Sequence, residues 1–161
     1  MHAASEVGAA RSAGSHARPA TRRPAVALAQ ALVLVVDDEA GIVEFLCYAL
    51  EEQGYRVASA RDGTAALDAI ARERPACVVT DLMMPRLNGW DLTRQLRRDA
   101  ETAGIPIVAM SAVDPTGAPA DAYLRKPFEL KDLLQILAGL GVAPALHTGS
   151  RRTNGRRDHC A

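Results

Sequence analysis

Cysteines and aromatic residues are scarce in this sequence of 161 residues, with three cysteines and an aromatic content of 4%. Cys47, Cys77 and Cys160 show no CxxC spacing, which argues against a structural zinc site. Three cysteines cannot all pair with one another, so we expect buried or tail thiols rather than a disulfide framework. The length also excludes a second folded domain of ordinary size beside one domain of about 100 to 150 residues.

Net charge is absent as well, because 19 lysines and arginines balance 19 aspartates and glutamates. The charges are unevenly distributed along the chain: residues 1–31 and 141–161 each have a net charge of +3, whereas residues 32–140 have a net charge of −6. We expect basic, disordered tails over 1–30 and 141–161 and one acidic folded domain over 31–140. Flexible, arginine-rich tails without aromatic residues bind nucleic acid weakly and without specificity, so solvated tails are the favoured interpretation.

Long hydrophobic runs are also missing. Residues 25–36 are apolar except for Gln30 and follow Arg22-Arg23-Pro24, an order that imitates a signal peptide. The run is too short to span a membrane. Its last part, Leu32–Val36, leads directly into Asp37. Cleavage of a signal peptide here would remove this apolar segment from the core, so we interpret it as a strand.

Three apolar runs of strand length are present at Leu32–Val36, Ala76–Val79 and Ile105–Met110. They are apolar on successive residues, which is typical of parallel strands covered on both faces. Tyr55–Ala60 and Ala122–Leu124 are weaker candidates. The five predicted strands alternate with helical patterns, apart from one gap before the last strand.

The helical patterns repeat apolar residues every three or four positions. The first stripe contains Ile42, Phe45, Leu46, Ala49 and Leu50, and the others cover 65–70, 89–100 and 130–137. In the third helix, Arg94, Arg97 and Arg98 are predicted to face outward. Alternation of strands and helices predicts an α/β fold with an open parallel sheet, right-handed crossovers and helices on both faces.

Four of the five predicted strands end on or run into a polar residue: Asp37 and Asp38 for the first, Asp81 for the third, Ser111 for the fourth and Lys126 for the fifth. Parallel strands end at one edge of a sheet, where function collects, so these side chains should converge. Three carboxylates repel one another unless a cation holds them, and oxygen ligands favour Mg²⁺. An ammonium and a hydroxyl beside that metal suit a phosphoryl group, and a carboxylate is the natural nucleophile. The pattern predicts an aspartyl-phosphate site.

The chain from 31 to 140 resembles the response regulator receiver domain, the CheY-like fold of two-component signalling. The resemblance lies in Val35–Glu39, Thr80–Pro85, Gly89, Met110–Ala112 and Tyr123–Phe128. It implies a flavodoxin-like, doubly wound sheet of five parallel strands in the order 2-1-3-4-5.

The resemblance also implies roles for the acidic residues. Asp81 is the expected phospho-acceptor, which takes the phosphoryl group from a sensor histidine kinase or a histidine phosphotransfer protein. Asp38, Asp81 and the backbone carbonyl of Met83 are expected to bind Mg²⁺, with Asp37 acting largely through a water. Capping of the first helix is the alternative role for Asp37 and Asp38.

Three further residues receive roles from the resemblance. Lys126 is expected to pair with the phosphoryl oxygens, and Ser111 to turn inward and hydrogen-bond them. Tyr123 matches the aromatic residue that changes rotamer together with Ser111, although simple packing is an alternative for it. The family implies a cis peptide bond between Lys126 and Pro127.

The sequence departs from the family between Ser111 and Lys126, where the spacing is shorter than usual. Two prolines and a glycine within Ala112–Asp121 argue against a helix, so the fourth helix should be missing or reduced to a turn. Met83 and Val113 occupy positions where the family tunes access of the hydrolytic water. Both are apolar, which predicts a long-lived phosphorylated form.

Together these features predict a single-domain, cytoplasmic response regulator, not an enzyme, that signals through protein contacts. A pseudo-receiver that works without phosphorylation is the alternative. A phosphatase with an aspartyl nucleophile would need a DxD pattern, which Asp37-Asp38-Glu39 does not supply.

Overall fold

The computed structural model describes residues 30–113, 115 and 117–145. The predicted tails fall mainly on residues 1–29 and 146–161, and Cys160 falls there too; these positions lie outside the described residues. None of the described helices is both long and apolar enough to cross a membrane.

Five parallel strands form one sheet in the order β2-β1-β3-β4-β5, as the resemblance implied. Its strands are β1 (Leu32–Val36), β2 (Arg56–Ala60), β3 (Cys77–Asp81), β4 (Ile107–Ser111) and β5 (Ala122–Arg125). The central strands β1, β3 and β4 are fully buried, which explains their continuous apolar sequences.

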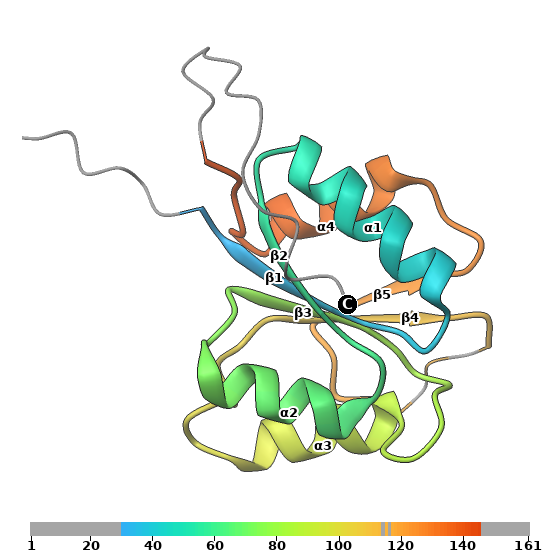
Figure 1. The fold of residues 1–161 in the computed structure, drawn as a ribbon. Coiled ribbons are helices and arrows are strands. Elements are labelled where there is room, and N and C mark those ends of the chain that lie inside the picture. Colours follow the sequence, from blue (N-terminus) through green and yellow to red (C-terminus); the bar gives the residue numbers. More distant parts are fainter. Residues whose placement is uncertain (1–29, 114, 116, 146–161) are drawn as a thin grey trace, which may run out of the picture.

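Helices cover both faces of this sheet: α1 and α4 lie on one face, and α2 and α3 on the other (Figure 1). Their bounds are Ala40–Glu52 for α1, Gly63–Arg72 for α2, Gly89–Arg98 for α3 and Leu130–Gly139 for α4. Two of them begin at side-chain caps that satisfy free backbone amides. Asp62 accepts a hydrogen bond from the amide of Ala65 at 2.8 Å, and Asn88 accepts one from Asp91 at 2.9 Å.

The core divides into two main clusters, because successive strand residues point to opposite faces of the sheet. Val33 and Val35 pack with α1 and α4, whereas Leu34 and Val36 pack with α2 and α3. The predicted stripe of α1 is wrong at Phe45, which is 54% exposed. Val43 and Cys47 are buried instead, so the inward face of α1 is rotated relative to the prediction.

The β4–β5 connection contains no helix among the residues that the structure describes there, 112, 113, 115 and 117–121, as predicted. An arginine of α3 fastens this connection. Arg97 donates to the carbonyls of Ala103, Ile105 and Pro119 and to the carboxylate of Asp121. The prediction that Arg97 faces outward is therefore wrong; its side chain is only 22% exposed because it is drawn onto these acceptors.

The chain stays packed beyond residue 140, where the sequence placed the end of the domain. Val142 is buried in the core, and its carbonyl accepts a hydrogen bond from the Tyr55 hydroxyl at 3.1 Å. The amide of Ala145 donates to the carbonyl of Gly54 at 3.2 Å. Residues 141–145 thus belong to the folded domain and lie at the edge of the sheet where the strands begin.

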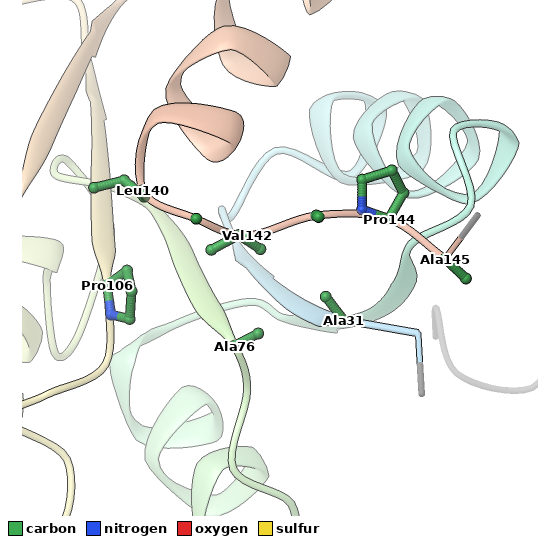
Figure 2. A pocket seen from close by; sticks show the side chains of 9 residues that line it. Ala31, Ala76, Pro106, Leu140, Val142, Pro144 and Ala145 are labelled. Atoms are coloured by element: carbon green, nitrogen blue, oxygen red, sulfur yellow. The ribbon is translucent and has the colours of Figure 1, made fainter. Parts of the chain in front are cut away.

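An apolar groove of about 410 Å³ lies at this amino edge, between the segment 140–145 and the residues that precede β1, β3 and β4 (Figure 2). Ala31, Ala76 and Pro106 line one side of it. Among the residues that the structure describes, those that line the groove carry no charged side chain. The chemistry-bearing residues lie at the opposite edge of the sheet.

Candidate phosphorylation and metal site

Three carboxylates converge at the carboxyl edge of the sheet, as predicted. Asp37 and Asp38 follow β1, and Asp81 is the last residue of the neighbouring strand β3. One oxygen from each lies within 4.8 Å of the others, close enough to share a cation. Asp37 is 0% exposed and Asp81 only 6%, whereas Asp38 is exposed and reaches solvent. The cluster is therefore a partly buried acidic cup with one open side.

The ammonium group of Lys126 lies between two of these carboxylates. Its Nζ is 2.9 Å from Oδ2 of Asp37 and 3.2 Å from Oδ1 of Asp81. Lys126 follows β5, and its amide donates to the carbonyl of Ser111 at 2.9 Å, which ties the two strand ends together. The Lys126–Pro127 peptide bond is cis, as the resemblance implied.

The environment shifts the pKa of two groups in this cluster. Burial raises the pKa of Asp81, and the charge of Asp37 adds to this effect, although Lys126 works against it. For Lys126, burial acts to lower the pKa, but the hydrogen bond and charge of Asp37 and the charge of Asp81 together raise it above its usual value. Three carboxylates facing one ammonium leave an excess of negative charge that favours a bound cation.

Backbone contacts fix the position of Asp81. The amide of Met83 donates to Oδ2 of Asp81 at 3.1 Å, and the amide of Leu82 donates to the carbonyl of Met110 at 3.0 Å. A Cβ atom on Gly89 would lie 2.0 Å from the carbonyl oxygen of Asp81. Only glycine fits there, so the start of α3 can approach the end of β3 this closely.

Capping alone does not describe Asp37. The N-cap residue of α1 is Glu39, which makes no side-chain capping bond. Oδ1 of Asp37 accepts from the amide of Glu39 at 2.9 Å, while its Oδ2 faces Lys126. Oδ1 therefore orients the carboxylate at the start of α1, and Oδ2 belongs to the cluster of charged groups.

Ser111 and Tyr123 lie on the neighbouring strands β4 and β5. The Ser111 hydroxyl is buried and accepts from the amide of Val113 at 3.1 Å. Tyr123 is 45% exposed, and its hydroxyl donates to the carbonyl of Ala118 in the β4–β5 connection. Burial in the core is therefore not the role of this tyrosine.

Asp62 and Arg86 lie in two loops at the same edge of the sheet and are not among the site residues predicted from the sequence. Asp62 follows β2 and is 6% exposed, and its Oδ2 accepts from Nε of Arg86 at 2.7 Å. An aspartate before a helical pattern signals an N-cap, but the arginine partner lies 24 positions away. Sequence spacing alone contains no signal for that pair.

Residues 33–138 match the family model described as the response regulator receiver domain. The chain belongs to this family. It is a receiver domain of a two-component response regulator, and its sheet order is the one found in the doubly wound fold.

Curated relatives agree with this assignment. The receiver domain is 44% identical over 115 residues to the response regulator MprA of Mycobacterium sp. (strain KMS), a match that covers 67% of this chain and 49% of that protein. It is 43% identical over 115 residues to the response regulator MprA of Mycobacterium avium (strain 104), with coverage of 67% and 50%. The chain thus spans about half the length of the curated relatives it matches.

Solved structures have the same fold. The chemotaxis protein CheY4 of Vibrio cholerae has a TM-score of 0.65 at 28% identity, covering 70% of this chain and 99% of that one. The receiver domain of a sensor histidine kinase from Pseudomonas aeruginosa, solved with a magnesium ion in its active-site cleft, has a TM-score of 0.65 at 29% identity, with coverage of 70% and 99%. The response regulator TrrA of Thermotoga maritima, solved with Mg²⁺ and BeF, has a TM-score of 0.63 at 29% identity, with coverage of 68% and 98%.

Proposed function

We propose that this receiver domain accepts a phosphoryl group on Asp81 in a Mg²⁺-dependent reaction. The observation that carries the proposal is the contact of Lys126 with both Asp37 and Asp81 inside a cluster of three carboxylates. An ammonium beside a carboxylate nucleophile can neutralise the charge that a phosphoryl group brings to it. The donor is a phosphohistidine on a sensor histidine kinase or a histidine phosphotransfer protein.

In the transfer step, a carboxylate oxygen of Asp81 attacks the phosphorus atom of the phosphohistidine. The new O–P bond forms as the N–P bond breaks, and the imidazole nitrogen keeps the electron pair of the broken bond. Lys126 stabilises the negative charge on the phosphoryl oxygens. The amide of Met83, which donates to Oδ2 of Asp81, holds the carboxylate in a fixed orientation.

The donor set fits a hard divalent cation, because it consists of carboxylate oxygens with one side open to water. Asp38, Asp81 and the backbone carbonyl of Met83 would hold Mg²⁺ directly, with Asp37 acting through a water. When bound, Mg²⁺ supplies charge neutralisation between the acidic residues and the incoming phosphoryl group.

Ser111 and Tyr123 form the switch in this proposal. The phosphoryl group offers strong acceptors, so the Ser111 hydroxyl turns toward it and gives up its bond with the amide of Val113. Tyr123 then leaves the carbonyl of Ala118 and rotates inward. The surface of β5 and of the β4–β5 connection changes, and a partner protein reads this change.

We further propose that the functional unit is the receiver domain itself, residues 31–140 with the packed segment that follows, and that it signals through protein contacts. On this view it is a signalling domain, and its own chemistry is limited to phosphotransfer and slow loss of the phosphoryl group. A pseudo-receiver that works without phosphorylation is the second candidate. The observation in its favour is that the described residues of the β4–β5 connection form no helix, which alters the surface through which a switch would act.

Phosphate incorporation separates the two candidates. Incubation with Mg²⁺ and a small-molecule phosphodonor should yield an acid-stable, base-labile phosphate on the wild-type protein. Asp81→Asn should abolish it, whereas Asp68→Asn, at an exposed position of α2, should leave it unchanged. Failure of the wild-type protein to incorporate phosphate from small donors and from cognate kinases would favour the pseudo-receiver.

A further inference from the structure

Two loops meet beside the phosphorylation site and are joined by paired contacts. The first is the β2–α2 loop, which ends at Asp62, directly before the first residue of α2, Gly63. The second is the β3–α3 loop over residues 82–88. Oδ2 of Asp62 accepts from both Nε and Nη2 of Arg86. The amide of Gly63 donates to the carbonyl of Leu87 at 2.9 Å. The β3–α3 loop is thereby attached to the start of α2.

The close approach of the two loops depends on their residue types. A Cβ atom on Gly63 would lie 2.6 Å from the carbonyl oxygen of Leu87, so a side chain there would push the loops apart. Arg86 has a φ of 62°, in the left-handed region that disfavours residues with a side chain. The ion pair with Asp62 holds Arg86 in this conformation.

The attached loop also carries the backbone of the proposed metal site. Met83 lies three positions before Arg86, and its amide contacts Asp81 while its carbonyl is the proposed Mg²⁺ ligand. Asp62 makes the attachment rigid, because its two oxygens have separate tasks. Oδ1 caps α2 through the amide of Ala65, and Oδ2 binds Arg86. The helix thus serves as a fixed support for the loop.

We propose that Asp62 and Arg86 are positioning residues that set the Mg²⁺ affinity of the receiver by fixing the β3–α3 loop, and with it the carbonyl of Met83. The inference rests on the proposed function, since it assumes that the carboxylate cluster binds Mg²⁺. Groups that orient metal ligands typically change metal affinity by about 10- to 100-fold when they are removed. Arg86 is largely exposed, so we expect an effect near the lower end of this range.

Two variants break the ion pair, and each keeps a feature that favours the native fold. Asp62→Asn retains a good N-cap residue for α2. Arg86→Gly removes the guanidinium and places glycine where φ is positive, which favours the folded backbone. The two variants have opposite electrostatic effects on a cation site, because one removes a negative charge and the other a positive charge. A purely electrostatic role therefore predicts that Arg86→Gly strengthens Mg²⁺ binding.

Isothermal titration calorimetry with MgCl₂ on the full chain measures the affinity. If the loop is positioned by the pair, both variants bind Mg²⁺ about tenfold more weakly than the wild type. The double variant then binds no more weakly than either single variant, because both act through one contact. Arg56→Gln is the matched control. It breaks the exposed ion pair with Glu73 at the opposite end of β2 and should leave the affinity unchanged.

Three results would overturn the inference: stronger binding by Arg86→Gly, a change smaller than twofold in either variant, or an equal loss in Arg56→Gln. These outcomes differ from failure of the proposed function, in which the wild-type protein itself does not bind Mg²⁺. Urea unfolding of each variant without metal checks that the fold is retained. Weaker binding by both variants with unchanged unfolding supports the positioning role.

Discussion

Replacement of Lys126 by methionine should destabilise the metal-free domain strongly. The substitution keeps a long side chain without charge but removes the ammonium that contacts Asp37 and Asp81. The three side chains are shielded from solvent, with exposures of 17% for Lys126, 0% for Asp37 and 8% for Asp81. Solvent therefore cannot replace the lost positive charge.

The distances give the magnitude. At an effective dielectric constant of about 20, charges separated by 2.9 Å and 3.2 Å attract by roughly 6 and 5 kcal/mol. The cost of taking these charges out of water offsets much of this attraction. Removal of one partner from a buried pair nevertheless costs about 3 to 5 kcal/mol, because it leaves an uncompensated charge. We expect a loss of this size in the free energy of unfolding.

Urea unfolding at neutral pH with a metal chelator measures the effect. The matched control is Lys131→Met, at the other of the two lysines. Lys131 pairs with Glu129, and their side chains are 65% and 71% exposed. An exposed pair of this kind contributes only about 0 to 1 kcal/mol, so this variant should unfold nearly as the wild type does. Addition of MgCl₂ should restore part of the loss in Lys126→Met, since the cation supplies the missing counter-charge.

The pH dependence gives a second check with a defined sign. The pKa of Lys126 is raised in the folded protein, so its stabilising effect is complete below its unfolded pKa of about 10.4 and is lost as the pH rises through the folded value. The variant should lack this alkaline loss. Burial raises the pKa of Asp81, so ionisation of this carboxyl group destabilises the folded protein. Lys126→Met should therefore regain stability as the pH falls and Asp81 becomes protonated. A loss no larger than that of Lys131→Met, or no recovery at low pH, would refute the reasoning.

Two further variants test the surroundings of Asp81. Met83→Asn, at a side chain that is 62% exposed, should speed the loss of phosphate by offering a polar group to the attacking water; slower or unchanged decay of the phosphorylated protein would contradict this. Gly89→Ala would place a Cβ atom 2.0 Å from the carbonyl of Asp81, so it should destabilise the fold by about 1 to 3 kcal/mol and weaken Mg²⁺ binding as well. Gly139→Ala, where nothing lies within 4 Å, should be tolerated in the same urea and calorimetric measurements.

Much of the fold could be predicted because local patterns and topology agree. Leu32–Val36 was predicted with its final bounds, since an apolar run meets charged residues at its end. The strand predicted over Ile105–Met110 begins and ends before the observed strand does. The strand is Ile107–Ser111 and begins after Pro106, which has no amide hydrogen to donate. Convergence of the strand-end residues followed from parallel topology alone.

The remaining features depend on contacts between segments that are far apart in sequence. Arg97 lies on the polar face of α3 by periodicity, yet it turns to acceptors in two other segments. The pair of Asp62 and Arg86 depends equally on how two loops meet. The rotamers of such long side chains are determined by tertiary acceptors, which periodicity does not encode. The roles of Asp81, Ser111 and Tyr123 remain predictions that the proposed experiments test.

The packed segment that ends at Ala145 has a practical consequence for handling the protein. Gln30 and Ala145 both lie at the edge where the strands begin, and a strand of five residues separates that edge from the acidic cup by about 16 Å. A fluorophore or a surface tether attached at Gln30 or Ala145 would lie on the side of the described domain that faces away from Asp81. Immobilised in this way, the protein would present its acidic cup outward to a soluble kinase, an orientation suited to surface-based binding measurements.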